Sequence, residues 1–224
     1  MLGSGVTPVA TVATVGAVVL AGGRSARMGE DKAWLDWHGQ PLLAHTCGLL
    51  AGCVEMPVVV VRSTPSQSLP PLPADVLVVD DPQPGHGPLM GVAAGLAAAG
   101  RVAEVVFVCA TDLPLLHPAF VRCLVAALGD PGPDPVDVAL PVVGGRWHPL
   151  AAAYRTGLAG EARSAVLSGD RRVQDFVASQ RHLLLDERRL LADPAVAAAD
   201  PRLESVVNVN DQAELARARA VRRG

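Results

Sequence analysis

Five short, almost uninterrupted apolar runs constrain the fold of this chain more than any other feature of its sequence. They cover residues 15–20, 57–62, 75–80, 104–109 and 137–143. Runs of this length without polar interruptions are typical of strands in a sheet that is covered on both faces. The alternation of these strands with helices predicts right-handed βαβ units in a three-layer α/β/α, Rossmann-like domain with a mostly parallel sheet.

Stretches rich in alanine and leucine separate or follow these runs and are predicted to be helices. They cover residues 41–50, 89–99, 118–128, 157–167 and 173–178. Two of them have proline at or near the first turn, where the missing N–H costs nothing. The length of 224 residues suits one domain. We therefore expect a single domain over residues 15–224 after a flexible N-terminal tail at 1–14.

The remaining segments are assigned from turn signals and short patterns. Residues 63–73 and 129–135 are rich in proline and are predicted to be surface loops. The charged and alanine-rich stretch 181–204 gives no clear pattern. Residues 205–211 are predicted to form a short strand and a turn, with Asp211 as the cap of the last helix.

Composition excludes several classes of partner. The net charge of −3 and the isoelectric point near 6.0 give no general attraction to nucleic acid or to an anionic membrane. No apolar run approaches the ~20 residues that span a bilayer, and the apolar N-terminus lacks the early positive charge and cleavage site of a signal peptide. The four cysteines form no C-x-x-C pair. They are interpreted as reduced, buried thiols of a cytoplasmic protein.

Residues suited to a phosphate ligand follow several of the predicted strands. Ligands of open α/β sheets bind beyond the carboxyl ends of the strands. The glycine-rich basic segment 20–32 follows the first strand, and Asp81 with the segment 85–91 follows the third. Asp112 follows the fourth strand, and two asparagines belong to the late segment 205–211. This convergence is stronger evidence than any single motif.

The segment LAGGRSARMGEDK has the chemistry of a phosphate-binding loop without the spacing of a P-loop or of a dinucleotide fingerprint. Gly22 and Gly23 would let the backbone approach an anion closely. Arg27 can fork onto phosphate oxygens, and Lys32 supplies a compact charge. The alternative is a flexible surface loop with solvated charges. Two cations spaced after an apolar strand favour phosphate binding.

Asp112 is the candidate metal ligand. A carboxylate at a strand end can hold Mg²⁺, which prefers one or two carboxylates together with waters and substrate phosphates. A turn or cap aspartate is the structural alternative, and the neighbouring phosphate loop favours the metal. Asn208 and Asn210 stand two residues apart, so their amides would share one face of the predicted strand and could join the metal or phosphate site. Turn and cap chemistry is their alternative role.

Gly87 and Gly91 flank the start of a predicted helix, where small residues would let a flat ring lie against the backbone. An ordinary helix entry is the alternative, and His86 is interpreted as a solvated turn residue. His148 is interpreted as structural, and residues 171–173 as an exposed helix start. Taken together, these residues predict an enzyme that acts on nucleotide phosphates with one Mg²⁺ site, without specifying the nucleotide.

The order of these motifs resembles a known family. LAGGRSARMGEDK is followed by GPLMG, TDLP, HPL, RRV and NVN, from about Gly16 to Leu215. In this order they resemble the molybdenum cofactor guanylyltransferases of the nucleotidyltransferase superfamily. The resemblance implies transfer of GMP from Mg·GTP to the terminal phosphate of molybdenum-bound molybdopterin, with release of pyrophosphate and formation of molybdopterin guanine dinucleotide. It also implies transient contact with molybdoenzymes or their chaperones.

The resemblance also implies a role for each matching residue. Nucleotide binding would involve Leu20, Ala21, Gly22, Gly23, Lys32, Asp81, Gly87, Gly91 and Asp112. Catalysis would rest on Arg27 and Lys32, which hold the phosphates, and on Asp112, which binds Mg²⁺. Asn208 and Asn210 would face the reacting phosphate from the acceptor side. Gly23 and Gly91 favour guanine over cytosine. No strong general base is required, because the acceptor phosphate is already ionised near neutral pH.

Several departures from the family pattern leave alternatives open. Asp80 and Asp81 compete for the nucleoside contact, and Val61-Arg62 stands where a polar residue often follows the second strand. Thr111 replaces a frequent cysteine, and the segment 186–204 is longer than the pattern needs. The rival functions are a cytidylyltransferase for the same pterin, a guanylyltransferase for a phosphorylated small acid, and a nucleotide-binding protein without catalysis.

Overall fold

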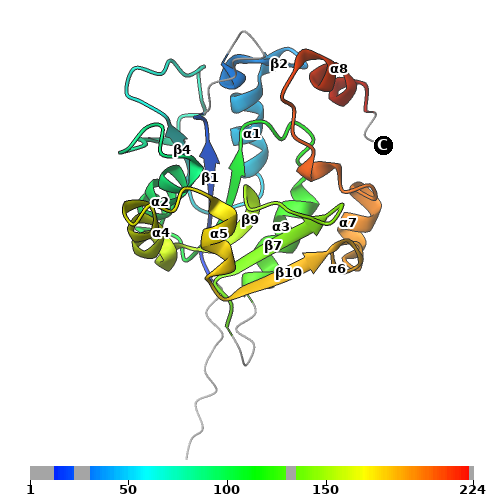
Figure 1. Ribbon diagram of the computed structural model, residues 1–224. Coiled ribbons are helices and arrows are strands. Elements are labelled where there is room, and N and C mark those ends of the chain that lie inside the picture. Colours follow the sequence, from blue (N-terminus) through cyan, green and yellow to red (C-terminus); the bar gives the residue numbers. More distant parts are fainter. Residues whose placement is uncertain (1–12, 23–30, 130–134, 222–224) are drawn as a thin grey trace, which may run out of the picture.

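The computed structural model describes residues 13–22, 31–129 and 135–221. Its main element is an eight-stranded sheet with the order β10-β7-β9-β6-β1-β4-β5, and β8 pairs with β7 (Figure 1). The strands are β1 (Val15–Leu20), β4 (Val58–Arg62), β5 (Leu77–Asp80), β6 (Val105–Ala110), β7 (Val138–Val143), β8 (Arg146–Trp147), β9 (Ala151–Arg155) and β10 (His182–Asp186). A separate pair consists of β2 (Asp36–Trp37) and β3 (Gln40–Pro41).

The prediction of a mostly parallel sheet is confirmed. β1 pairs in parallel with both β4 and β6, as do β4 with β5 and β7 with β10. The exceptions are β9, which runs antiparallel between β6 and β7, and the short β8. The carboxyl ends of β1, β4, β5 and β6 therefore lie along one edge of the sheet.

Helices cover both faces of the sheet and give three layers (Figure 1). They are α1 (Leu42–Ala51), α2 (Pro88–Ala99), α3 (Pro118–Gly129), α4 (Ala159–Leu167), α5 (Val173–Ala178), α6 (Glu187–Leu190), α7 (Pro194–Ala199) and α8 (Gln212–Ala220), with 3-10 turns η1 (Lys32–Trp34), η2 (Thr156–Leu158) and η3 (Glu204–Val206). The alternation within β1 separates two cores: Ala17 and Val19 pack with α1, α3, α6 and α7, and Val18 and Leu20 pack with α2, α4 and α5.

A third apolar cluster lies apart from these two cores and holds the C-terminal helix in place. Its buried members are Leu35, Trp37, Leu42, Leu115, Val209, Leu215 and Ala218. They come from the residues after η1, including β2, from the start of α1, from the segment after β6, from the segment before α8 and from α8 itself. The cluster therefore fastens the segment before α8 to the residues that follow β1 and β6.

The five predicted strands and five predicted helices are all present, with ends that differ by up to two residues. The prediction of a strand within 205–211 is wrong: η3 ends at Val206, and residues 207–211 have no helix or strand. Asp211 does cap α8, since its carboxylate accepts a hydrogen bond from the Glu214 amide at 2.7 Å. The stretch 181–204, which gave no pattern, contains β10, α6 and α7.

Other sequence expectations have different outcomes. All four cysteines are free thiols, two of them buried and two half-buried. Among the described residues, no helix is long and apolar enough to cross a membrane. The loop 63–73 is without helix or strand, whereas most of 129–135 lies outside the described residues. The division of the chain into a tail and one domain stays a prediction.

Candidate active site

The carboxyl ends of β1, β4 and β6 meet through backbone hydrogen bonds. Thr111, which follows β6, donates both its amide and its hydroxyl to the carbonyl of Leu20, at 3.2 and 3.0 Å. The Ala21 amide donates to the Val61 carbonyl at 2.9 Å. The first residues after β1 are therefore fixed between the two neighbouring strands, and Asp112 stands beside them.

Four of the predicted site residues form one hydrogen-bonded group beyond this edge. The Lys32 ammonium lies 2.8 Å from Asp112 Oδ2 and 3.0 Å from Asn210 Oδ1. The Asn208 amide donates to Asp112 Oδ1 at 3.0 Å. The side chains of Lys32 and Asp112 are 18% and 15% exposed, so the pair is shielded yet reachable from solvent.

Local structure explains why these side chains converge. Asp31 caps η1 by accepting from the Ala33 amide at 3.0 Å, which fixes the turn that carries Lys32. The Val209 amide donates to the Asp112 carbonyl at 2.9 Å, and the Val209 side chain is fully buried. The anchored valine leaves its two asparagine neighbours exposed on the side of Asp112.

The predicted glycines have structural reasons for their small size. At Gly91 an added Cβ would lie 3.3 Å from the Leu20 side chain, so the start of α2 packs directly over the end of β1. Gly87 has φ of +87° and precedes Pro88, the first residue of α2. A Cβ there would lie 2.8 Å from the Arg171 carbonyl oxygen. The predicted helix entry at Gly87 is confirmed, and it borders the exposed start of α5.

Asp80 and Asp81 have different partners. Asp80 ends β5 and its carboxylate lies 2.5 Å from the Arg62 guanidinium. Asp81 receives a hydrogen bond from the Gln83 amide at 2.8 Å and donates its own amide to the Arg62 carbonyl. The choice of Asp81 for the nucleoside stays a prediction. Arg62, which departs from the family pattern, forms an ion pair with the competing carboxylate.

Two predicted phosphate ligands, Gly23 and Arg27, lie outside the described residues. Gly22 is exposed, and an added Cβ would lie 3.1 Å from the Ser63 Cβ, so its small size serves a close contact with the following loop. The sequence reasoning missed Gln67, which contacts residues at both ends of the basic segment. No sequence signal distinguishes this glutamine in a loop rich in proline and serine.

His86 and His148, which the sequence predicts as a solvated turn residue and as a structural residue, behave as expected. His86 is an exposed turn residue. His148 is half-buried, and its Nε2 lies 3.3 Å from the Val143 carbonyl. Burial, with a smaller contribution from Arg146, lowers the pKa of His148 below its ordinary value. Neither histidine is hydrogen-bonded to Lys32 or Asp112 in the described structure.

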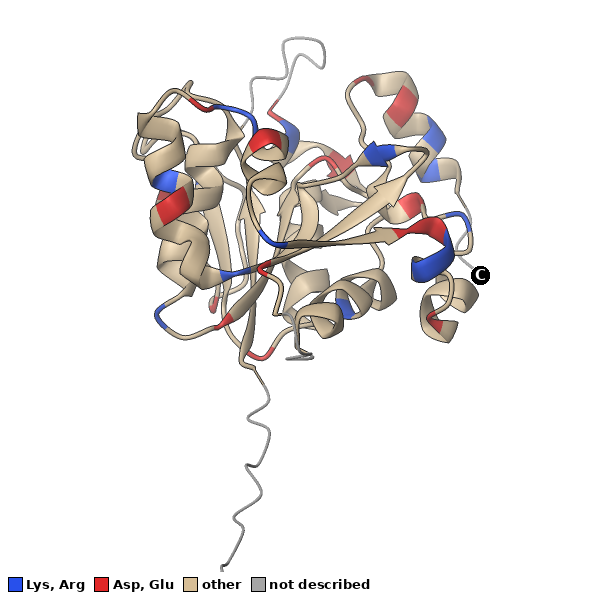
Figure 2. Ribbon diagram, turned by 60° about the horizontal axis from the view of Figure 1, so that its bottom comes forward, with Lys and Arg blue, Asp and Glu red and all other residues tan. Residues whose placement is uncertain are grey.

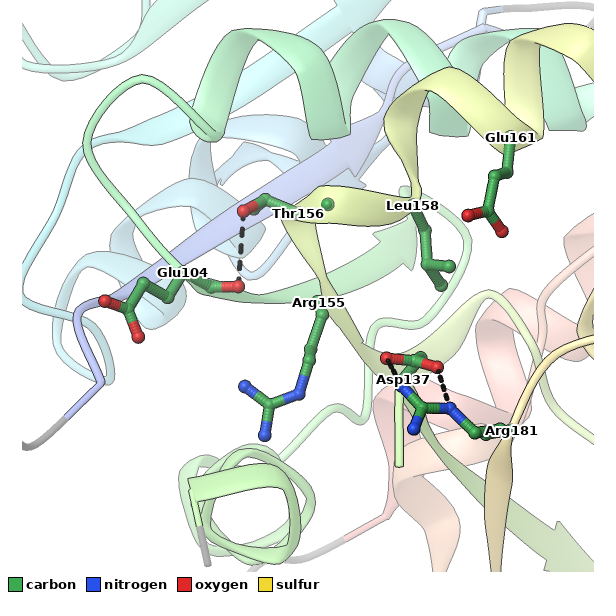
Figure 3. A pocket seen from close by; sticks show the side chains of 8 residues that line it. Glu104, Asp137, Arg155, Thr156, Leu158, Glu161 and Arg181 are labelled. Atoms are coloured by element: carbon green, nitrogen blue, oxygen red, sulfur yellow. Dashed lines mark hydrogen bonds and ion pairs between the residues drawn. The ribbon is translucent and has the colours of Figure 1, made fainter. Parts of the chain in front are cut away.

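A separate hollow of about 380 Å³ lies at the opposite edge of the sheet (Figure 3). It is lined by Glu104, Asp137, Arg155, Thr156, Gly157, Leu158, Glu161 and Arg181. Glu104 and Asp137 immediately precede β6 and β7, so this is the amino edge. Arg155 binds the carbonyls of Leu128 and Val136, and Arg181 forms an ion pair with Asp137. The arginines of the hollow therefore connect neighbouring segments of the chain, and the hollow lies at the edge of the sheet opposite to the candidate active site.

Acidic and basic side chains are mixed over the surface of the described elements. Figure 2 shows acidic and basic positions interspersed over the described elements. The described residues contain no cluster of three or more histidine, cysteine, aspartate or glutamate side chains suited to a metal. A cation at the carboxyl edge would therefore depend on Asp112, on amide oxygens and on oxygens from substrate and water. This set of hard oxygen donors fits Mg²⁺.

A mostly parallel sheet that gathers a lysine, a carboxylate and two amides beyond its carboxyl edge defines the class of nucleotide-binding α/β domains. Residues 17–184 match the model of the MobA-like NTP transferase domain. The chain belongs to this family and is a nucleotidyltransferase.

Relatives of known sequence support this assignment. The chain is 39% identical over 180 residues to the probable molybdenum cofactor guanylyltransferase of Mycobacterium tuberculosis H37Rv, covering 77% of this chain and 85% of the relative. It is 36% identical over 192 residues to the molybdenum cofactor guanylyltransferase of Pseudomonas aeruginosa LESB58, covering 84% and 88% of the two chains.

Solved structures show the same fold at lower identity. The molybdopterin-guanine dinucleotide biosynthesis protein A of Archaeoglobus fulgidus has a TM-score of 0.71 and 22% identity, covering 91% of this chain and 96% of that one. The 2-C-methyl-D-erythritol 4-phosphate cytidylyltransferase of Thermus thermophilus has a TM-score of 0.63 and 17% identity, with the same coverage. The fold is thus shared by transferases that are named for different nucleotides.

Proposed function

We propose that the chain transfers GMP from GTP to the terminal phosphate of molybdenum-bound molybdopterin, which releases pyrophosphate and forms molybdopterin guanine dinucleotide. The observation that carries this proposal is the identity of 36–39% to relatives named molybdenum cofactor guanylyltransferase, over most of their length. The geometry adds support, because Lys32 and Asp112 lie in contact at the carboxyl edge of the sheet.

Lys32 is the phosphate-binding cation in this account. An ammonium group has three donors, and the described structure uses two of them, on Asp112 and Asn210. The third can donate to a phosphate oxygen without disturbing the group. Charge developing at the α-phosphate and on pyrophosphate would then be stabilised by a cation that is already in place. Arg27 would supply a second cation to the same phosphates.

Asp112 is the proposed Mg²⁺ ligand. Its two oxygens each accept one hydrogen bond, from Lys32 and Asn208. Each oxygen keeps a lone pair, so the oriented carboxylate retains room for a cation. The family's chemistry implies a divalent cation, and when bound Mg²⁺ would neutralise phosphate charge and orient the triphosphate. Residues 13–22, 31–129 and 135–221 supply no dedicated metal cage, so we expect metal and nucleotide to bind together.

The remaining roles follow the positions of the residues. Leu20, Ala21, Gly22 and Gly23 would contact the nucleotide where β1 ends, with Asp81, Gly87 and Gly91 around its base and sugar. Asn208 and Asn210 would face the pterin phosphate, because they approach Asp112 from the C-terminal segment. No general base is needed for an ionised acceptor phosphate. We expect the protein to act in the cytoplasm and to hand its product to molybdoenzymes or their chaperones.

The experiment that tests the choice of nucleotide is a thermal shift with GTP, CTP, ATP and UTP, each with Mg²⁺. A ligand that binds only the folded state stabilises it by about 2.7 kcal/mol at a hundredfold excess over Kd. We expect GTP to give the largest rise in Tm. A rise with CTP instead would indicate the cytidylyltransferase. A shift by GTP without turnover in the presence of molybdopterin would favour another acceptor or a binding protein.

A further inference from the structure

Gln67 connects three separate parts of the chain near the end of β1. Its side-chain amide nitrogen donates to the Ala21 carbonyl at 2.8 Å and to Asp31 Oδ2 at 2.9 Å. Its amide oxygen accepts from the backbone N–H of Ser63 at 2.7 Å and from the Ser63 hydroxyl at 3.0 Å. Two donors and two acceptor sites are all that a glutamine amide offers. Every one of them is used.

The two donor contacts lie at the two ends of the basic segment. Ala21 directly follows β1, and Asp31 directly precedes Lys32. The loop after β4 thus holds both ends of this segment with one side chain. Gly22 packs against Ser63 in the same place, with only 3.1 Å between an added Cβ and the Ser63 Cβ. Gly22 and Ser63 therefore approach each other closely at the start of the basic segment.

The contact with Asp31 reaches Lys32 through a short chain of bonds. Asp31 uses one oxygen to cap η1 at the Ala33 amide and the other to accept from Gln67. A second bond fastens η1 to the same loop, because the Trp34 indole N–H donates to the Ser68 carbonyl at 3.0 Å. Lys32 is the first residue of η1, so the orientation of this turn sets where its ammonium lies.

We propose that Gln67 is a positioning residue for the nucleotide-phosphate site. It forms no hydrogen bond with Lys32 or Asp112 in the described structure. It acts by fixing the Ala21 carbonyl and the Asp31 carboxylate relative to each other, and hence the turn that presents Lys32. The expected consequence, weaker GTP binding when Gln67 is changed, rests on the proposed function. Whether Gln67 holds the turn η1 in place can be tested without any ligand.

The most informative substitution is Gln67→Glu, which keeps the shape of the side chain. A carboxylate replaces the donor with an oxygen that faces the Ala21 carbonyl and the Asp31 carboxylate, so two attractive contacts become repulsive. We expect the Kd for GTP with Mg²⁺, measured by calorimetry, to rise roughly tenfold or more, as for a lost hydrogen bond to a charged group. The rise should shrink from about pH 8 to about pH 5.5, because a protonated glutamic acid can donate again.

A second substitution tests whether the contact between positions 67 and 31 carries the effect. In the double variant Gln67→Glu with Asp31→Asn, the new asparagine can still cap Ala33 with its oxygen and can donate its amide to the new carboxylate. The hydrogen bond is restored with reversed polarity. We expect the double variant to bind GTP several-fold more tightly than Gln67→Glu alone, although the repulsion at Ala21 remains. GTP binding by the double variant that is no tighter than that of Gln67→Glu would show that the contact between positions 67 and 31 does not carry the effect.

The control is Gln180→Glu, the same substitution at a half-buried glutamine just before β10. The readout that needs no ligand is hydrogen exchange at the Ala33 amide, which should accelerate in Gln67→Glu and Gln67→Ala and stay unchanged in the control. Unchanged Ala33 exchange, or unchanged GTP affinity in both Gln67 variants of a protein that binds GTP, would overturn the inference. If the unaltered protein binds no GTP, the proposed function fails, and the exchange data still decide whether Gln67 holds the turn.

Discussion

Lys32 is the only lysine in the chain, and every other basic residue is an arginine or a histidine. Its place between Asp112 and Asn210 suits a compact ammonium better than a planar guanidinium. The ammonium is a point charge with three donors, whereas arginine presents a rigid fork. Because Lys32 is the only side-chain amine, an amine-specific reagent can modify only this site and the N-terminal amine.

We predict that Lys32→Met lowers kcat/KM for GTP by about 10² to 10³, the range found when one transition-state donor is removed. Lys32→Arg keeps the charge but not the geometry, and should recover only a small part of the loss. Steady-state kinetics with pyrophosphate detection measures both. Full activity in Lys32→Met would remove this lysine from the mechanism.

Asp112→Asn tests the carboxylate with almost no change of shape. The Asn208 contact can persist to the new amide oxygen, but the new NH2 group then faces the Lys32 ammonium and the ion pair is lost. Because the pair is still partly exposed, we expect the fold to survive with a small decrease in Tm. Activity should fall at least about tenfold at low Mg²⁺, since a neutral amide is a weaker ligand for a hard cation than a carboxylate. Activity titrated against Mg²⁺ measures this, and an unchanged titration curve would exclude Asp112 as the ligand.

At the scale of elements, strands made of valine- and leucine-rich runs were predictable, including the exposed edge strand β5, whereas β9, although buried, and β10 were not. β1 and β6 are valine-rich, and their central residues are fully buried. No polar residue therefore interrupts the apolar pattern that predicts these strands. β9 begins with three alanines, which have low strand propensity, and β10 lies within a charged stretch. The segment 205–211 alternates like a strand, but Val209 pairs its amide with Asp112 instead of a sheet neighbour.

The packing of α2 on β1 gives a prediction about stability. An added Cβ at Gly95 would lie 2.3 Å from Val18 Cγ1, in the fully buried interface between helix and sheet. We expect Gly95→Ala to lower the free energy of unfolding by about 1–3 kcal/mol, as overpacked cores do. Gly160→Ala in α4 is the matched control, because nothing lies within 4 Å of its added Cβ. It should be neutral or stabilise by up to ~1 kcal/mol, as urea titrations of both variants can measure.

The β8–β9 connection gives a prediction about pH. Burial lowers the pKa of His148 in the folded state below its ordinary value of 6.5. The unfolded chain therefore binds more protons at this residue as the pH falls through that value, and folding stability decreases. We expect the free energy of unfolding to fall between about pH 7 and about pH 5, and His148→Gln to flatten this dependence. An identical pH profile in the variant would show that His148 contributes nothing to it.

At the scale of the whole molecule, the sheet separates two apolar cores and places different chemistry at its two edges. The carboxyl edge holds the lysine, carboxylate and amide group, and the amino edge holds the hollow in which arginines bind carbonyls and Asp137. Lys32, Asp112 and Asn208 are distant in sequence. Lys32 and Asp112 could be predicted as neighbours because each belongs to a segment that follows a strand of one parallel sheet. The sequence places the asparagines at the same site on an expected strand, but they follow η3 instead.

The parts of the site that could not be predicted depend on contacts that leave no pattern. Gln67 is one polar residue among many in a proline-rich loop, and only the folded chain shows that its amide joins Ala21 to Asp31. The partner of Asp80 likewise depends on the register of β4 with β5, which pairs Arg62 with Asp80. Gly23 and Arg27 lie outside the described residues, and their roles stay predictions.

The most direct test of guanylyl transfer follows the phosphates of GTP separately. The purified protein is incubated with molybdenum-bound molybdopterin, Mg²⁺ and GTP that is labelled at either the α- or the γ-phosphate. We predict that the α label appears in the pterin dinucleotide and the γ label in pyrophosphate, in equal amounts. Appearance of the γ label on the pterin, release of inorganic phosphate alone, or transfer from CTP in preference to GTP would contradict the account.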